Sequence, residues 1–228
     1  MSKLHFLHSG GDKVTLETPA NNPSTNPVFK LPQEDGSSGQ FLKTDGSGAL
    51  SFATPSPAAG TIIQVVSTPV DSTDSISLST QYSYYPITPL DTTITTTRAN
   101  SKILVTAGIG GEANHEDYHL AFRCGRVIGG SLQIIFKGAD AGNRTTALAM
   151  GNTGYFADDQ NSTTAYNSFA NMLDSPNQPA GTSITYRFFV STLAGNNATY
   201  FLNRTVNTGD SQSYERTFSY LTLMEVSA

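Results

Sequence analysis

The feature that most constrains the fold is a series of short apolar runs that recur at close intervals from Thr61 to the C-terminus. They are rich in Val, Ile, Thr, Tyr and Phe, and clusters of Gly, Asn, Asp and Pro separate them. Representative runs are "TIIQVVS", "SKILVTAGI", "SITYRFFVS" and "RTFSYLTLMEV". Such runs are typical of strands, and many short strands between turns are typical of a sandwich or barrel. We therefore expect residues 61–228 to form an all-β sandwich of the jelly-roll type.

The last of these runs predicts a strand whose inward and outward positions alternate. The expected inward positions are Phe218, Tyr220 or Leu221, Leu223 and Val226, and the expected polar positions are Ser219, Thr222 and Glu225.

The segment "AYNSFANMLDSP" fits two templates. Its apolar residues Tyr166, Phe169 and Leu173 also follow a helical spacing, so periodicity alone does not decide between helix and strand. We favour a strand because the neighbouring runs are strands and because Asn and Ser between the apolar residues are poor helix formers.

Residues 1–53 differ from the remainder, because their apolar stretches are too short to close a core within one chain. The piece "GQFLKTDGSGALSFA" predicts a hairpin, since two apolar runs flank a glycine-containing tight turn. The proline- and alanine-rich stretch from Thr54 to Gly60 predicts a linker to the sandwich.

Composition restricts the partners. The chain has 13 Lys and Arg against 18 Asp and Glu, and this net charge of -5 disfavours binding to nucleic acid. The start, "MSKLHFLHSGGDK", contains no apolar signal core, and no run approaches the roughly 20 apolar residues of a membrane span. We therefore expect neither export nor membrane insertion, and we expect the single cysteine, Cys124, to be a buried apolar residue.

The stretch "NHEDYHLAF" contains His-Glu-x-x-His, from His115 to His119, which on a helix is typical of a zinc protease. Three glycines in the preceding "TAGIGGEAN" disfavour a helix, and "LAFRC" alternates like a strand. On a strand, residues four apart are separated by roughly 13 Å, so both rings could not reach one zinc ion at about 2.1 Å. The other histidines, His5 and His8, lie in the N-terminal module and supply no third ligand nearby. We expect no metal site in this stretch, and we place His119 at the start of a strand.

The sequence contains no other catalytic pattern. Phosphate-binding loops and a nucleophile elbow are absent. The adjacent carboxylates at Glu116-Asp117 and at Asp158-Asp159 are typical of solvated loop tips, whereas glycosidase acids face one another across a cleft. We predict a protein that is not an enzyme and needs no cofactor.

Two parts of the chain carry a resemblance to a known group. The run "SGGDKVTLETPANNPSTNPVFKLP" followed by "DGSSGQFLKTDGSGALSFA" resembles a repeat module of tail-fibre-like structural proteins from marine and cyanobacterial bacteriophages. The segments "SKILVTA", "LDSP", "TYRFFV", "FLNRT" and "RTFSYLTLMEV" are similar to the knob that often follows this module. The module occurs once in this chain, whereas shafts of that group often repeat it.

The resemblance implies a homotrimeric virion appendage that is assembled in the host cytoplasm. Its short N-terminal β module would attach to other virion proteins, and its sandwich knob would contact a glycan or protein on the host surface. Polar loops rich in Tyr and Asn are the candidate contacts, since aromatic faces and amides suit sugar recognition. These candidates are His115, Glu116, Asp117, Tyr118, Tyr155, Asp158, Asp159, Asn196 and Asn197.

Alternatives stay open at this point. The same loops could be solvent-exposed without binding anything, and the protein could be a capsid decoration or head fibre without a receptor role. A glycan depolymerase of the tailspike type is disfavoured, because the chain is too short for a long β-helix with facing acids.

Overall fold

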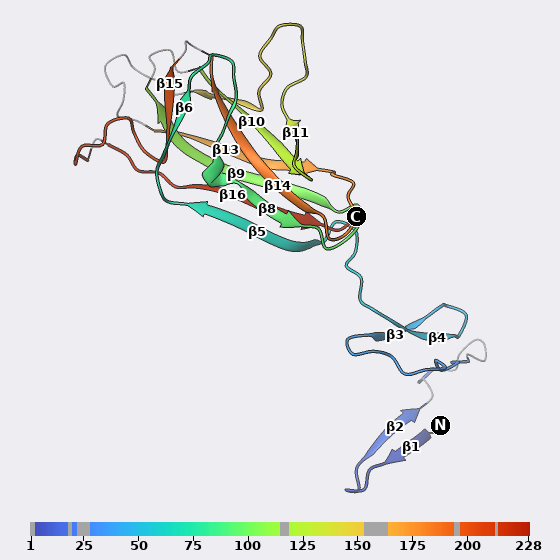
Figure 1. Ribbon diagram of the computed structural model, residues 1–228. Helices are drawn as coiled ribbons and strands as arrows, with labels where there is room; N and C mark the ends of the chain where they lie inside the picture. The colour runs from blue at the N-terminus through green and yellow to red at the C-terminus, as the bar shows by residue number, and fades with distance from the viewer. Residues whose placement is uncertain are drawn as a thin grey trace. The chain divides into compact units, whose positions relative to one another are not determined.

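The computed structural model describes residues 3–17, 20–21, 28–114, 119–152, 164–193, 197–212 and 214–228. The chain divides into two compact units, Met1–Ser56 and Pro57–Ala228, and their boundary falls within the stretch from Thr54 to Gly60. Apart from the short 3-10 helix η1 (Thr88–Leu90), every regular element in the described residues is a strand (Figure 1). The all-β prediction is confirmed.

The N-terminal unit contains two separate hairpins. In the first, β1 (Lys3–Leu7) pairs antiparallel with β2 (Lys13–Glu17). In the second, β3 (Phe41–Thr44) pairs with β4 (Leu50–Ala53), which confirms the hairpin predicted from the sequence. Its turn uses Gly46 and Gly48 at φ values of 83° and 96°, a conformation that glycine adopts without steric cost.

The C-terminal unit is built from two six-stranded sheets. The strands of the first sheet are β5 (Ile62–Val70), β6 (Asp74–Leu78), β9 (Lys102–Ala113), β13 (Ala165–Asp174), β15 (Ala198–Leu202) and β16 (Ser219–Val226). The strands of the second sheet are β7 (Tyr85–Pro86), β8 (Thr92–Thr95), β10 (His119–Ile128), β11 (Ser131–Phe136), β12 (Ala149–Asn152) and β14 (Ser183–Thr192). All pairings between these strands are antiparallel.

The strand order identifies a jelly roll. Four positions are occupied by two consecutive strands. Three of these couples share one partner: β7 and β8 both pair with β14, β11 and β12 with β10, and β15 and β16 with β9. In the fourth, β5 pairs with β16 and β6 pairs with β15. Counting each pair as one interrupted strand gives eight strands in chain order. The first sheet then has the order 1-8-3-6 and the second the order 2-7-4-5, which is the double-sheet jelly-roll arrangement. The predicted sandwich is thereby confirmed.

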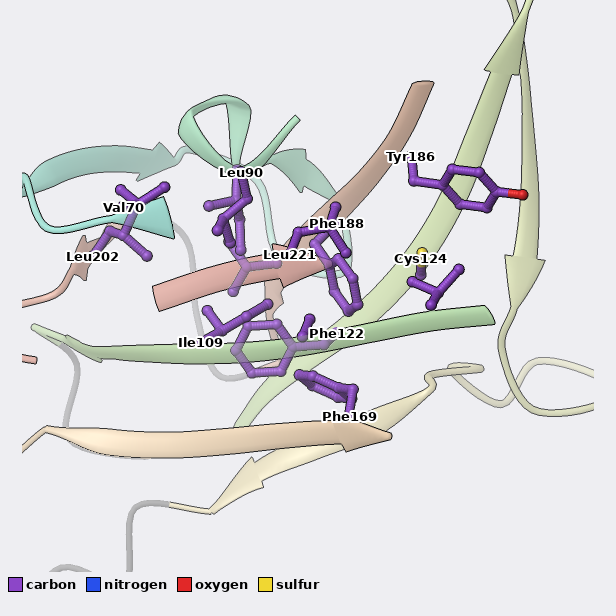
Figure 2. Packing of buried hydrophobic residues seen from close by; sticks show 14 of the residues in the cluster. Val70, Leu90, Ile109, Phe122, Cys124, Phe169, Tyr186, Phe188, Leu202 and Leu221 are labelled. Atoms are coloured by element: carbon purple, nitrogen blue, oxygen red, sulfur yellow. The ribbon is translucent and has the colours of Figure 1, made fainter. Parts of the chain in front are cut away.

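The core lies between the two sheets. Every buried apolar side chain among the described residues falls between Val70 and Leu223. Phe122 of the second sheet meets Phe169 of the first with ring centroids 5.8 Å apart, and Phe169 meets Phe188 at 5.1 Å (Figure 2). These edge and tilted ring contacts add to the burial that holds the sheets together.

The strand prediction for "AYNSFANMLDSP" is confirmed by β13, which pairs with β9 along most of its length. A bulge between Phe169 and Met172 places Asn171 at a φ of 58°, which asparagine tolerates better than most residues. The bulge keeps Phe169 and Met172 both buried, although their spacing does not fit a regular strand.

The predicted inward face of the last strand is only partly correct. Along β16 the buried positions are Ser219, Leu221, Leu223 and Glu225, while Phe218 is 48% exposed and Val226 is only partly buried. Of the predicted inward residues, Leu223 and the alternative Leu221 are correct.

Glu225 is buried because the backbone of a neighbouring turn surrounds its carboxylate. The N–H of Thr97 donates to both carboxylate oxygens at 2.8 and 3.0 Å, and the N–H of Arg98 donates at 3.2 Å. Burial alone would raise the pKa of Glu225, but the hydrogen bonds from Ser101, Thr97 and Arg98 outweigh it and hold that pKa below its ordinary range. The carboxylate thus satisfies turn amides that a hydrophobic residue would leave unpaired.

A second buried carboxylate links the two sheets. Asp174 of β13 accepts from Nη1 of Arg126 at 2.6 Å at each oxygen, and from the hydroxyl of Tyr186 at 2.7 Å. Arg126 and Tyr186 both belong to the second sheet. Burial and the charge of Asp174 raise the pKa of Tyr186, so its hydroxyl keeps the proton that it donates.

Candidate functional site

The first hairpin has two chemically different faces. Leu4 lies opposite Leu16 and Phe6 opposite Val14, so all four side chains share one face. Their exposed fractions lie between 54% and 67%. On the other face Lys3 forms an ion pair with Glu17, and His5 hydrogen-bonds Thr15 at 2.9 Å. A two-stranded hairpin is only marginally stable in water, so this apolar face requires a cover.

The second hairpin also exposes large apolar side chains. Leu42 lies opposite Phe52, and each is more than 40% exposed. One side of the Phe52 ring rests on Gly36, where a Cβ atom would lie 2.5 Å from the ring. The preceding segment contributes further exposed apolar side chains, namely Val28, Phe29 and Leu31. Among the described residues of this unit, no apolar side chain is fully buried.

Most of the predicted contact residues lie outside the described part of the chain. These are His115, Glu116, Asp117, Tyr118, Tyr155, Asp158, Asp159 and Asn196. Asn197 is described: it has a φ of 62° and directly precedes β15. The prediction that His119 begins a strand is confirmed by β10.

The described residues that flank these loops converge at one end of the sandwich. The N–H of Asn114 donates to the carbonyl of Thr199 at 3.1 Å, and the side chain of Asn114 accepts from the N–H of Thr199 at 2.7 Å. In the second sheet, His119 pairs with Asn152, and Leu120 pairs with Thr192. The residues that flank segments 115–118, 153–163 and 194–196 therefore lie at the same end of the sandwich.

A pocket not predicted from the sequence lies in the insertion between β15 and β16. It has a volume of about 310 Å³, and polar residues of this insertion line most of it. The lining residues are Arg204, Thr205, Asn207, Thr208, Gly209, Asp210, Ser211, Tyr214, Glu215 and Arg216. The polar run "NRTVNTGDSQSYER" between two apolar runs is the sequence signal that could have indicated it.

Buried polar groups fix both ends of this insertion. The side-chain amide of Asn203 donates to the carbonyls of Val70 and Ser72 at 2.8 and 3.0 Å, and the hydroxyl of Ser219 donates to its oxygen at 2.5 Å. Farther along, a carboxylate oxygen of Glu112 accepts from the N–H of Val206 at 2.7 Å. The insertion is therefore anchored to the first sheet by hydrogen bonds as well as by its flanking strands.

Two arginines stand next to each other in the pocket. Arg204 and Arg216 form an antiparallel β-bridge, which places their side chains on one face. The Arg204 guanidinium lies 4.1 Å from the Phe201 ring centroid, and its Nη1 donates to the Thr205 and Val206 carbonyls at 2.9 and 3.1 Å. Burial and the neighbouring charge of Arg216 lower the pKa of Arg204. The pocket thus contains a fixed guanidinium beside a second one.

Catalytic and metal chemistry find little support among the described residues. No three His, Cys, Asp or Glu side chains in this part of the chain gather closely enough to hold a metal ion. Cys124 is buried, as predicted, and burial raises the pKa of its thiol far above the physiological range. Within the described ranges, no helix has the length and apolar character that crossing a membrane would demand.

Comparison with known proteins gives structural neighbours only. No known protein family matches the sequence, and no curated protein is detectably related to it. The chain is similar to a structure of the infectious bursal disease virus Gx strain, with a TM-score of 0.36 and 12% identity over 95% of this chain and 44% of that one. It is also similar to the VP2 subviral particle of that virus, with a TM-score of 0.34, 13% identity and coverage of 78% and 44%. For the Gt strain the values are 0.34, 14%, 95% and 52%. The chain spans about half the length of these matched chains.

Proposed function

We propose that this chain is a non-enzymatic structural protein of a bacteriophage virion, a homotrimeric fibre with a knob that contacts the host surface. The N-terminal unit attaches it to other virion proteins, and the jelly roll faces outward. The protein is assembled in the host cytoplasm and stays with the particle.

One observation carries this proposal, namely the exposed apolar face of Leu4, Phe6, Val14 and Leu16. This face contains no charged group, whereas the opposite face carries Lys3, Lys13 and Glu17, so the apolar face suits copies of itself. Three such hairpins with their apolar faces turned inward exclude water without burying a charge. The chain has a single cysteine and therefore no internal disulfide to stabilise it. In a trimer, burial of apolar surface between the copies would supply this stability.

The knob role rests on the loops at one end of the sandwich. A jelly roll supplies a rigid scaffold, and binding residues are concentrated on the loops of such scaffolds. The flanking pairs Asn114 with Thr199 and His119 with Asn152 hold the loop ends close together, so several loops can contact one receptor.

The host-contact role is tested by adsorption of fluorescently labelled full-length protein to host cells. We expect saturable binding that is lost when His115, Glu116, Asp117 and Tyr118 are all replaced by Ala. The matched control is Lys102→Ala, since Lys102 is exposed at the opposite end of β9 and its loss should leave binding unchanged.

The alternative function, a capsid decoration or head fibre, predicts a different result for host adsorption and is tested further by antibody labelling of purified particles. The protein would then be found on purified particles by antibody labelling but would not adsorb to host cells. Adsorption that survives the fourfold loop substitution would assign host contact to another surface of the protein.

A further inference from the structure

The pocket of the β15–β16 insertion contains an unusual arrangement of charge. Arg204 and Arg216 are direct neighbours across a β-bridge, and like charges in that position destabilise a pair of strands. Among the described residues, neither arginine belongs to an ion pair. An anion bound between the guanidiniums would remove the repulsion.

The carboxylates of the pocket limit the charge of that anion. Glu215 accepts hydrogen bonds from the N–H and hydroxyl of Thr164 at 2.6 and 2.7 Å, so one of its oxygens is already occupied. Asp210 also lines the pocket and reduces the positive charge there. The two carboxylates equal the two arginines in number, so the lining has no net positive charge and disfavours a doubly charged phosphate. A singly charged carboxylate needs only the local charge of one arginine.

The two guanidiniums have different roles. Arg204 is held by the Thr205 and Val206 carbonyls and by the Ser75 hydroxyl, which leaves it as a fixed positive charge. Arg216 is exposed, and a planar guanidinium can bind a carboxylate through two parallel hydrogen bonds. We therefore assign direct contact with the anion to Arg216.

The rest of the lining suits a sugar. Thr208 and Ser211 supply hydroxyl groups, and Tyr214 supplies an aromatic ring that packs beside Gly209. Sugars present hydroxyls that need polar partners and apolar faces that pack on aromatic rings. A volume of about 310 Å³ lies at the lower end of ligand pockets, so it fits a small group of one or two sugar rings.

From this geometry we propose that the pocket binds a carboxylate-bearing sugar residue, with Arg216 on the carboxylate and Tyr214 against the ring. This inference deepens the host-contact role proposed above and rests on it, because an acidic surface polysaccharide would be the receptor. The contact surface then includes an insertion within the eighth jelly-roll strand, in addition to the loops at the sandwich end.

The test is calorimetric titration of the full-length protein with a galacturonate trisaccharide and with its neutral galactose counterpart. We expect saturable binding of the acidic sugar, and Arg216→Ala should weaken it by about tenfold or more, since a charge-assisted pair of hydrogen bonds is lost. Arg216→Lys should restore part of the affinity. Arg144→Ala, which removes another exposed arginine from a different part of the chain, should leave the affinity unchanged.

Three results would overturn the inference: no saturable binding of the acidic sugar, equal binding of the neutral sugar, or unchanged affinity in Arg216→Ala. The melting temperature of each variant shows whether it is folded. Host adsorption of the same protein separates the two proposals. Adsorption without sugar binding refutes only the proposal that the pocket binds an acidic sugar. Sugar binding without adsorption refutes only the host-contact role.

Discussion

The two units of this chain differ in how far they bury their apolar side chains. In the unit Pro57–Ala228, two sheets face each other and enclose rings such as Phe122 and Phe188 completely. In the unit Met1–Ser56, hairpins of similar residue types leave Phe6 and Leu16 more than half exposed. Strand-forming sequence is therefore not enough for an independent fold, because a second layer has to cover each apolar face.

The largest expected effect comes from separating the two units. We expect residues 57–228 alone to unfold cooperatively, since their core is complete within one chain. Residues 1–56 as a single chain should show no cooperative transition, because no described apolar side chain is fully buried there. For each fragment, circular dichroism measures the unfolding transition, and the dispersion of amide NMR signals shows whether the fragment is folded. A cooperatively folded monomer of residues 1–56 would remove the contrast between the units.

Within the sandwich, Asp174→Ala should be more damaging than any of the other substitutions proposed below. It leaves the largely buried Arg126 charge without its partner. Such a loss costs up to about 3–5 kcal/mol for a fully buried pair, and 13% exposure of the Arg126 side chain should place it toward the lower end. Chemical denaturation measures the loss. Asp71→Ala is the matched control, since Asp71 is exposed and its removal should change stability by less than about 0.5 kcal/mol.

Glu225→Gln should have a smaller effect that depends on pH. The folded state lowers the pKa of Glu225, so the carboxylate stabilises the fold above its ordinary pKa of about 4.3, and this gain disappears as the pH falls through the lower folded value. Near pH 7 we expect a loss of about 1.5–3 kcal/mol, typical of hydrogen bonds to a charged group.

The difference between wild type and Glu225→Gln should shrink in acid, and denaturation curves from pH 7 to pH 3 measure it. Asp71→Asn is the control, since it changes an exposed carboxylate. If the difference in free energy of unfolding between wild type and Glu225→Gln did not depend on pH, the charge of Glu225 would contribute nothing to stability.

The smallest effect on the sandwich is expected from Phe6→Ser combined with Leu16→Ser. These side chains lie in the N-terminal unit, so the sandwich should keep its stability within about 0.5 kcal/mol. The same double variant should lose self-association, because the apolar face would no longer exclude water. The pair Lys13→Ser and Thr15→Ser changes the other face and should leave association intact. A double Phe6 and Leu16 variant that associates normally would place the contact elsewhere.

Local patterns predicted much of the fold. The β3–β4 hairpin followed from its glycine turn, and β13 followed from residues that disfavour a helix. The inward face of β16 could not be predicted in this way, because the partners of Glu225 lie at Thr97 and Arg98, far away in the sequence. Alternation predicts which residues share a face, but burial of a charge depends on what the fold places opposite it.

The candidate sites show the same limit. The exposed apolar stretches of residues 1–53 were visible in the sequence, since they are too short to form a core. The pocket with the two arginines was not visible in the sequence, because Arg204 and Arg216 become neighbours only through the fold of the insertion between β15 and β16. Of the nine predicted contact residues, only Asn197 lies in the described part of the chain, and its place directly before β15 agrees with a surface role without testing it.

The most direct test of the central claim is the mass of the full-length protein in solution, measured by light scattering after size separation. The proposed homotrimer covers the apolar faces of the N-terminal hairpins with copies of themselves, so we expect the mass of three chains at micromolar concentration. A clean single-chain mass, with the sandwich folded and the N-terminal unit intact, would contradict the proposed assembly.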